Sequence, residues 1–190
     1  MRIIAGQFRG RALANVGKGD NSAHLRPTTD RVRESLFNVL THRHDIPGAR
    51  VLDLFAGTGA LGLEALSRGA AQATFVDDGR AAGQLIRRNI ELTGCDDRAK
   101  LIRQDATRLG PCATGPFDLV FLDPPYGKGL GQIAMDAAMR GNWLAPGALV
   151  VWEESEPVSA PAGLSLIDNR RYGDTHVTLM QNGEDGSAPD

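Results

Sequence analysis

Four adjacent residues, Asp123, Pro124, Pro125 and Tyr126, follow an apolar run at residues 119–122 that is typical of a buried strand. Two successive prolines cannot continue a central strand, because each lacks a backbone N–H and fixes its own φ. The chain should therefore leave the sheet after Asp123, with a carboxylate, two free peptide carbonyls and an aromatic ring at the edge. These groups suit a flat ring that bears an amine, although the tetrapeptide alone could also be a plain proline-rich exit from a strand.

A glycine-rich turn forms a second candidate site. Gly57 and Gly59 follow a predicted strand and precede a predicted helix, so the backbone there can pass close to a ligand at a helix N-terminus. This context predicts a nucleotide-like ligand. Asp53, at the start of the stretch, would repel a pyrophosphate and instead suits a cationic part of the ligand.

Two more acidic residues follow the next two predicted strands. Asp77 comes 24 residues after Asp53 and could accept hydrogen bonds from both hydroxyls of a ribose, with Asp78 as a competitor and a solvated acid as the alternative. Asp105 could accept from an adenine amino group, or it could cap a helix that starts at Ala106. Acids after successive strands indicate one ligand site at the carboxyl edge of an open α/β sheet.

The elements that must position these residues alternate along the chain. The predicted strands are residues 51–55, 73–76, 100–103, 118–122 and 149–152, and the predicted helices after the first strand are residues 60–68, 80–92 and 130–140. Strands separated by helices predict βαβ units and a parallel sheet that is covered on both faces. Residues 164–169 and 176–180 are joined by only six residues, so we expect an antiparallel hairpin. The expected fold class is α/β, with a seven-stranded, mostly parallel sheet and one antiparallel edge strand.

Two further elements precede this sheet. Residues 2–7 and 11–16 are predicted to form a small N-terminal β-hairpin that has little to bury and is an appendage. A helix follows Pro27, capped by Thr28 or Thr29, with an apolar stripe at positions 32, 36, 39 and 40. Arg31 and Arg33 lie off that stripe and are expected to be exposed. We divide the chain into residues 1–25 (hairpin extension and loop), 26–182 (main domain) and 183–190 (disordered tail).

The composition places bounds on the class of protein. The chain of 190 residues suffices for one well-buried domain and is too short for two full ones. No apolar run approaches the roughly 20 residues that span a bilayer, and we see no signal peptide. Cys95 and Cys112 are far apart without clustered histidines, so we expect incidental thiols, no metal, and a cytoplasmic location. We expect a monomer.

The charge is distributed unevenly. The net charge is −2, yet the first fifty residues hold nine basic against four acidic residues, which is +5. Eighteen of the 21 basic residues are arginines, whose guanidinium group pairs with phosphates in a forked geometry. A basic front end on a mildly acidic protein favours a local contact with a polyanion, although a solvated charged face is nearly as compatible.

Several stretches together resemble one family. The chain is similar to class I S-adenosylmethionine-dependent methyltransferases, which have a Rossmann-like fold, and within that class it resembles the RsmD family. The resemblance is carried by residues 2–11, residues 26–37, the glycine-rich stretch through residue 70, the Asp-Pro-Pro-Tyr tetrapeptide, and residues 171–175. It implies methylation of the exocyclic N2 amine of a guanine in 16S ribosomal RNA, within a small-subunit ribonucleoprotein particle.

The resemblance also implies how S-adenosylmethionine is held. The turn after the first strand would hold the methionine part, Asp77 the ribose hydroxyls, and Asp105 with Ala106 the adenine edge, while Arg26 and Thr28 would close over the methionine end. Asp77 stands where the family commonly has glutamate. The full expected cofactor set is Arg26, Thr28, Asp53, Phe55, Gly57, Gly59, Asp77, Asp105 and Ala106.

The expected chemistry follows from the amine. Asp123 and the Pro124 carbonyl would accept hydrogen bonds from the guanine amino group, and Tyr126 would stack on the base, so Asp123, Pro124, Pro125 and Tyr126 form the expected catalytic set. The base should be flipped out or lie in a loop. The residues expected to hold RNA phosphates are Arg2, Arg9, Arg11, Arg31 and Arg33.

Two other functions remain open at this point. The tetrapeptide also suits adenine N6 in DNA or RNA, although a DNA enzyme usually needs a separate recognition domain for which this chain has no room. A protein-glutamine methyltransferase normally begins the tetrapeptide with asparagine, so Asp123 argues against it. A non-catalytic cofactor-binding or ribosome-assembly protein is the alternative from a different class.

Overall fold

A computed structural model describes residues 1–15 and 29–183 of the chain. The predicted polar loop at residues 17–22 and the predicted disordered tail, apart from residue 183, lie outside the described residues. Arg26 and Thr28, two of the expected cofactor-binding residues, lie outside them as well. Among the described residues, no helix is both long and apolar enough to cross a membrane.

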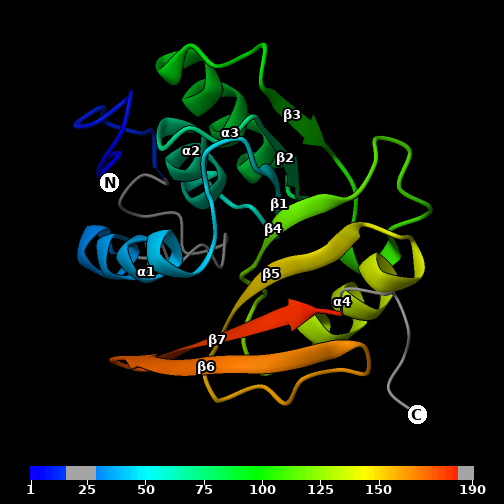
Figure 1. Cartoon of the computed structure of the whole chain (residues 1–190). Helices are drawn as coiled ribbons and strands as arrows, with labels where there is room; N and C mark the ends of the chain where they lie inside the picture. Colours follow the sequence, from blue (N-terminus) through cyan, green and yellow to red (C-terminus); the bar gives the residue numbers. More distant parts are fainter. Residues whose placement is uncertain (16–28, 184–190) are drawn as a thin grey trace.

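One seven-stranded sheet forms the centre of the molecule (Figure 1). The five strands that run parallel are β1 (Arg50–Leu54), β2 (Gln72–Val76), β3 (Ala99–Ile102), β4 (Phe117–Leu122) and β5 (Leu144–Glu154). The order across the sheet is β3-β2-β1-β4-β5-β7-β6. Strand β1 lies near the middle, and the chain first builds one half of the sheet and then crosses to the other. The five strands predicted for the parallel part of the sheet are confirmed, with β5 longer than expected.

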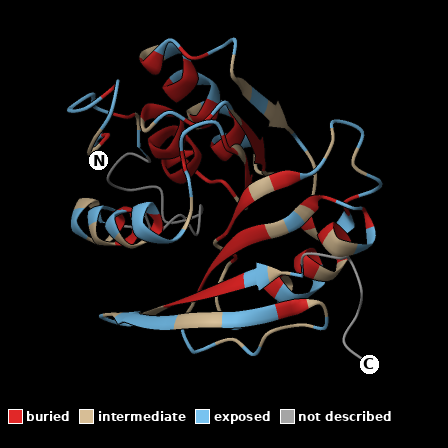
Figure 2. Cartoon of the chain, in the orientation of Figure 1, coloured by how far each residue is buried: buried red, intermediate tan, exposed pale blue. Residues whose placement is uncertain are grey.

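The last two strands form the predicted antiparallel hairpin. β6 (Leu164–Tyr172) pairs with β7 (Thr175–Asn182) through a tight turn, and β7 pairs antiparallel with β5. β6 is thus the outer strand at this end of the sheet, and Figure 2 shows its ribbon as mainly exposed or intermediate. The prediction of a mostly parallel sheet with an antiparallel edge is confirmed.

In the described part of the chain, four α-helices cover the two faces of the sheet. α1 (Asp30–Arg43), α2 (Ala60–Ser67) and α3 (Arg80–Thr93) lie on one face, and α4 (Leu130–Arg140) lies on the other with the short 3₁₀ helix η1 (Ala106–Arg108). Because successive side chains of a strand point to opposite faces, the apolar residues of each strand divide between two cores. Val51 and Phe121 belong to the first core, and Leu52 and Val120 to the second.

The N-terminal segment is not an appendage, and the expectation that it has little to bury is wrong. Its two arms pair only at Arg2 and Ala12, but Ile3, Phe8 and Leu13 are buried in the core on the side of α2 and α3. The contact with α2 is close: a Cβ atom at Gly6, which has φ +81°, would lie 1.9 Å from the Ser67 carbonyl oxygen. The segment therefore belongs to the domain that it covers.

Helix α1 begins as predicted but buries one arginine. Its N-cap is Thr29, whose hydroxyl accepts a hydrogen bond from the Val32 N–H at 3.3 Å. The expectation that Arg33 is exposed is wrong, because the buried face of α1 consists of Arg33, Leu36, Phe37 and Leu40. At 0% exposure, the Arg33 side chain cannot contact an RNA phosphate at the surface.

Candidate active site at the carboxyl edge of the sheet

The turn between β1 and α2 is shaped by an unusual backbone. Phe55 has φ +56°, a conformation that is strained for a bulky residue and that occurs mainly where a site requires it. Gly57 and Gly59 follow with φ +56° and +75°, and Gly59 is the N-cap of α2. Gly62 must also lack a side chain, because a Cβ atom would lie 2.4 Å from the Phe75 ring. The turn can therefore approach a ligand with its backbone.

Asp53, inside β1, holds the first turn of α2 through a hydrogen bond. Its side chain is buried, and its Oδ2 atom accepts a hydrogen bond from the Gly62 N–H at 3.0 Å. Burial raises the pKa of Asp53 to about 8, with further increases from the charges of Asp77 and Glu153, and the Gly62 bond opposes the rise. A carboxyl group in this state favours a proton or a cationic ligand group beside it.

Asp77 lies at the end of β2, as predicted, and connects two loops. One of its oxygens accepts from the Gly57 N–H at 2.9 Å, and the other accepts from the Gly79 N–H at 2.9 Å. Burial raises the pKa of Asp77, although these two N–H groups act against the rise. Asp78 is exposed, so Asp77 is the acid that faces the glycine turn. The structure thus brings Asp53, Gly57 and Asp77 together.

Asp105 follows β3 and is used locally. Its Oδ1 atom accepts from the Thr107 N–H at 2.8 Å and from the Thr107 hydroxyl at 2.6 Å, which makes it the N-cap of η1. The Thr107 hydroxyl contact lowers the pKa of Asp105, so this carboxylate remains ionised. Ala106 is buried against the second core. Of the two roles predicted for Asp105, these contacts therefore show the helix cap.

The Asp-Pro-Pro-Tyr segment leaves the sheet where the two prolines predict it. β4 ends at Leu122, and one further ladder contact joins the Asp123 N–H to the Leu54 carbonyl at 3.4 Å. Pro124 is buried, while Asp123 is partly exposed. Among the residues that the structure describes, none donates a hydrogen bond to the Asp123 carboxylate or to the Pro124 carbonyl.

Several carboxyl groups crowd around Asp123. Burial raises the pKa of Asp123 well above the ordinary range. The negative charges of Glu153, Asp53 and Glu154 raise it further. The register explains the proximity, because Leu122 pairs with Trp152, which places Asp123 beside Glu153 on the neighbouring strand. This concentration of negative charge at one sheet edge favours a cation near Asp123.

Tyr126 is held by the β6–β7 hairpin. Its hydroxyl lies 3.2 Å from the Thr175 Oγ1 atom, at the start of β7. Burial raises the pKa of Tyr126 to about 12, so the hydroxyl stays protonated at neutral pH. The hairpin at the far end of the chain thus fixes the position of the ring beside Asp123.

The sequence analysis missed two residues of this edge. Glu153 is buried, and the Glu154 Oε1 atom accepts from the Gly127 N–H at 3.2 Å, which holds the loop that follows Tyr126. Both residues follow the apolar run at residues 149–152, so the rule that singled out Asp77 and Asp105, an acid directly after a strand, could have found them.

The arginines expected to bind RNA are spread over two regions. Arg2 lies beside the start of α1, with its Nε atom 3.5 Å from the Asp30 Oδ2 atom, and Arg31 is exposed nearby. Arg9 is exposed, and an Arg11 guanidinium N–H donates to the carbonyl of Leu92, in the last turn of α3. That turn leads into the start of β3, so Arg11 lies toward the opposite edge of the sheet from Asp123.

Comparison with known proteins identifies similar chains over nearly the full length. A family model described as Conserved hypothetical protein 95 matches residues 1–181. Ribosomal RNA small subunit methyltransferase D from Haemophilus influenzae is 37% identical over 188 residues, which cover 96% of this chain and 94% of that protein. The protein of the same name from Escherichia coli K12 is 39% identical over 191 residues, with coverages of 99% and 93%.

The fold is also similar to solved structures. The structure of the yhhF protein from Escherichia coli superposes with a TM-score of 0.81 at 39% identity, and the match covers 96% of this chain and 98% of that one. The similarity therefore includes the N-terminal segment, the sheet and the terminal hairpin.

Proposed function

The chain belongs to the RsmD family, and from this membership we propose that it methylates the exocyclic N2 amine of a guanine in small-subunit (16S) ribosomal RNA, with S-adenosylmethionine as the methyl donor. The observation that carries the proposal is the position of Asp123, at the start of the Asp-Pro-Pro-Tyr segment, beside the end of β1 and close to Asp53. A monomer in the cytoplasm is part of the proposal.

The site fits such a cofactor by its charge and its backbone. When bound, S-adenosylmethionine supplies a methyl group on a positively charged sulfur, which is already a strong electrophile, so the protein supplies mainly placement. The buried acids Asp53 and Glu153 favour a cation at this edge. In the proposal the turn from Phe55 to Gly59 and Asp53 hold the methionine part, and Asp77 accepts from the ribose hydroxyls.

The adenine end and the cover are the remaining parts of the cofactor proposal. Asp105 and Ala106 would border the adenine ring, with Asp105 using the oxygen that Thr107 does not occupy. Arg26 and Thr28 would close over the methionine end. These assignments rest on the family resemblance and on the position of each residue after its strand or before α1.

Asp123 has the central role in the chemistry. The lone pair of a guanine amino group is conjugated into the ring and must lose that overlap before the nitrogen can attack. Hydrogen bonds to the Asp123 carboxylate and the Pro124 carbonyl favour this change and aim the nitrogen. The raised pKa of Asp123 also makes it a suitable acceptor for the proton that the nitrogen sheds.

Pro125 and Tyr126 shape the binding place of the base. The second proline fixes the exit of the chain from the sheet, and Tyr126 offers a ring face on which a flipped base can stack, a contact worth about 1–3 kcal/mol. Thr175 keeps the Tyr126 hydroxyl in place. In the proposal, RNA phosphates contact Arg2, Arg9, Arg11 and Arg31, and the buried Arg33 is not included.

One experiment tests the reaction and the target atom together. Small ribosomal subunits from a strain that lacks the enzyme are incubated with the protein and radiolabelled S-adenosylmethionine, and the RNA is digested to nucleosides. We expect label in N2-methylguanosine. Label in N6-methyladenosine would replace guanine by adenine as the target, and the absence of any transfer would favour a binding protein without catalysis.

The role of Asp123 has its own test. We expect Asp123→Ala to lower the rate of methyl transfer by about a hundredfold or more, because a positioned acceptor typically contributes that much, while cofactor affinity changes little. Rapid-quench transfer assays and calorimetric titration with S-adenosylmethionine measure the two effects. Asp136→Ala, on α4, is the control and should be normal in both. Near-normal turnover of Asp123→Ala would refute the role.

A further inference from the structure

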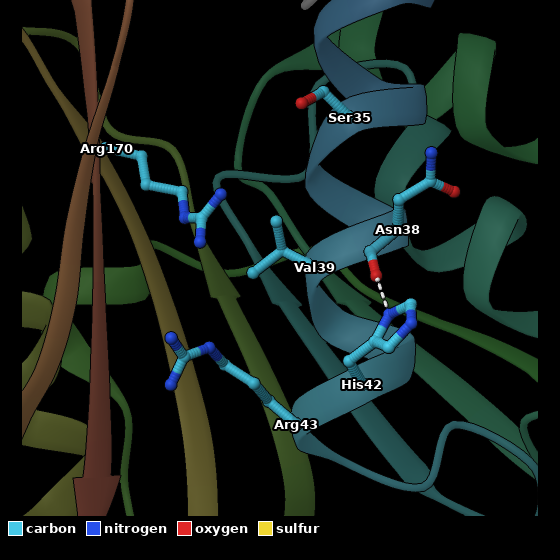
Figure 3. Close-up of a pocket in the computed structure, with 6 residues that line it drawn as sticks. All are labelled: Ser35, Asn38, Val39, His42, Arg43 and Arg170. Atoms are coloured by element: carbon cyan, nitrogen blue, oxygen red, sulfur yellow. Dashed lines mark hydrogen bonds between the residues drawn. The ribbon is translucent and has the colours of Figure 1, made fainter.

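A groove runs between helix α1 and strand β6 (Figure 3). The described residues that line it are Ser35, Asn38, Val39, His42, Arg43 and Arg170. Figure 3 shows the Arg43 and Arg170 side chains extending from the two opposite walls, with Val39 between them. No acidic side chain is among these lining residues, and only one of them is apolar. The lining thus suits an anion better than an apolar peptide.

The two arginines are held in place by a single carboxylate. The Asp168 Oδ2 atom lies 3.0 Å from an Arg43 terminal nitrogen and 3.0 Å from the Arg170 Nε atom. Each contact uses one N–H group of a guanidinium that has five donors, and Arg170 also makes a hydrogen bond with the Tyr172 side chain, so further donors of both arginines remain. One carboxylate also leaves one of the two positive charges uncompensated. The Arg43 and Arg170 side chains are 38% and 42% exposed, so these donors are accessible.

A series of contacts through the β6–β7 hairpin connects the groove with the candidate active site. The Ser35 hydroxyl, at the upper end of the groove, lies 3.3 Å from the Tyr172 hydroxyl at the end of β6. Tyr172 pairs with Thr175 across the hairpin turn, and Thr175 contacts the Tyr126 hydroxyl at 3.2 Å. From Ser35 to Arg43, α1 extends for about 12 Å at 1.5 Å per residue. A strand that leaves the site past Tyr126 would therefore meet the groove.

We propose that this groove binds the phosphate backbone of the RNA strand that flanks the methylated base, with Arg43 and Arg170 as the phosphate ligands. The inference rests on the proposed function, which supplies the RNA. Forked guanidinium groups match phosphate oxygens, and two of them fixed by Asp168 lose little side-chain entropy on binding. The contact is to the backbone and carries no base specificity, so it positions the RNA strand.

Salt dependence of binding tests the proposal. The double variant Arg43→Gln/Arg170→Gln keeps the approximate side-chain length and removes both charges. We expect the slope of log K against log salt for protein-free small-subunit RNA to become shallower by about 1 to 2, since each phosphate contributes about 0.7–0.9. Affinity near 0.15 M salt should fall by about tenfold. Arg87→Gln/Arg88→Gln, on the exposed side of α3 at the other end of the sheet, is the matched control.

The outcomes separate this proposal from the proposed function. Fold and cofactor site are checked by thermal midpoint and S-adenosylmethionine titration, which should be unchanged in both double variants. A slope that changes no more than in the control would overturn the groove as a phosphate site, even if the wild-type protein methylates guanine. A loss seen with assembled subunits but not with protein-free RNA would also overturn it, and would assign the groove to a ribosomal protein. Failure of the wild-type protein to methylate RNA would instead refute the proposed function.

Discussion

Asp53 keeps a carboxyl group where water hardly reaches it. It is 2% exposed and accepts one hydrogen bond, from the Gly62 N–H. Burial and the charges of neighbouring carboxyl groups raise its pKa from 3.8 to about 8. In the protein without its cofactor, a neutral amide at this position would therefore be more stable than the ionised carboxylate. Such a residue is expected where binding a cation is the purpose of the site.

The pH dependence of stability follows from this pKa. The folded state holds the Asp53 proton more tightly than the unfolded state, so the contribution of Asp53 to stability is fully present below about pH 4 and is lost as the pH rises toward 8. For one proton the loss is at most about 1.4 kcal/mol per pH unit. We expect Asp53→Asn to remove much of this dependence and to stabilise the protein at pH 8. Urea unfolding at pH 5.5 and pH 8 measures it.

The control for this prediction is Asp45→Asn, at an exposed position that should leave the pH dependence unchanged. Asp53→Asn should also weaken cofactor binding, because the amide no longer attracts a cation. A variant whose unfolding free energy falls with pH as steeply as that of the wild-type protein would show that Asp53 is ionised in the folded state at neutral pH.

At the scale of residues, the site was predictable where local rules apply. An acid directly after an apolar run marks the carboxyl edge of a parallel sheet, and this rule located Asp77 and Asp123. Asp53 lies inside β1 and was predicted from the glycine turn that follows it. Applied once more, the rule would have included Glu153. The rule could not predict that Asp105 accepts two hydrogen bonds from Thr107, because the choice between binding a ligand and capping a helix depends on local geometry.

The N-terminal segment has no regular secondary structure, and a buried carboxylate is one of the side chains that anchor it. The Glu64 carboxylate, in α2, is fully buried and accepts from the Ile4 N–H at 2.8 Å and the Ala5 N–H at 3.1 Å. It also pairs with Arg68 at 2.8 Å and lies 3.8 Å from the Arg33 Nε atom. Glu64 therefore joins the segment, α1 and α2.

Removal of this carboxylate should be costly. We expect Glu64→Ala to lower the free energy of unfolding by about 3–5 kcal/mol, because it leaves the buried Arg33 with less countercharge and two backbone N–H groups without their acceptor. Urea unfolding provides the measurement. Glu91→Ala removes an exposed pair with Arg88 on α3 and should cost under about 1 kcal/mol. Equal effects of the two substitutions would contradict the anchoring role.

At the scale of elements, hydrophobic periodicity predicted the strands and helices of the sheet. It could not predict contacts between residues that are distant in the sequence. The four α-helices and seven strands follow from apolar spacing, glycines and prolines. The burial of Arg33 does not, because Glu64 lies 31 positions away and only the fold brings the two charges together. The burial of Ile3 and Phe8 was not predicted either. Their stretch of sequence is typical of a short hairpin, and only the fold places α2 against it.

Across the whole molecule, the predicted phosphate contacts fall in separate regions. Arg43 and Arg170 adjoin the edge that carries Asp123, whereas Arg9 and Arg11 lie by the far ends of α2 and α3. RNA that contacts both sets would have to cover one side of the protein. The excess of positive charge in the first fifty residues favours such an extended contact.

The extent of the RNA contact is testable. If RNA reaches the N-terminal segment, Arg9→Ala/Arg11→Ala should make the salt slope of RNA binding shallower by about 1 to 2, as expected for two lost phosphate contacts. Fluorescence titrations over a range of salt concentrations measure it, with Arg87→Ala/Arg88→Ala as the matched control. An unchanged slope would confine the RNA to the edge near Asp123.

The docking of the N-terminal segment also has a consequence for the order of events during synthesis. Residues 1–14 leave the ribosome well before three of the residues that hold them, Glu64, Ser67 and Asn89. At about 5–20 residues per second, the interval between residue 14 and residue 89 lasts roughly 4–15 s. During that time Ile3, Phe8 and Leu13 lack the α2 and α3 residues that bury them in the folded protein, so these apolar side chains stay exposed in the nascent chain.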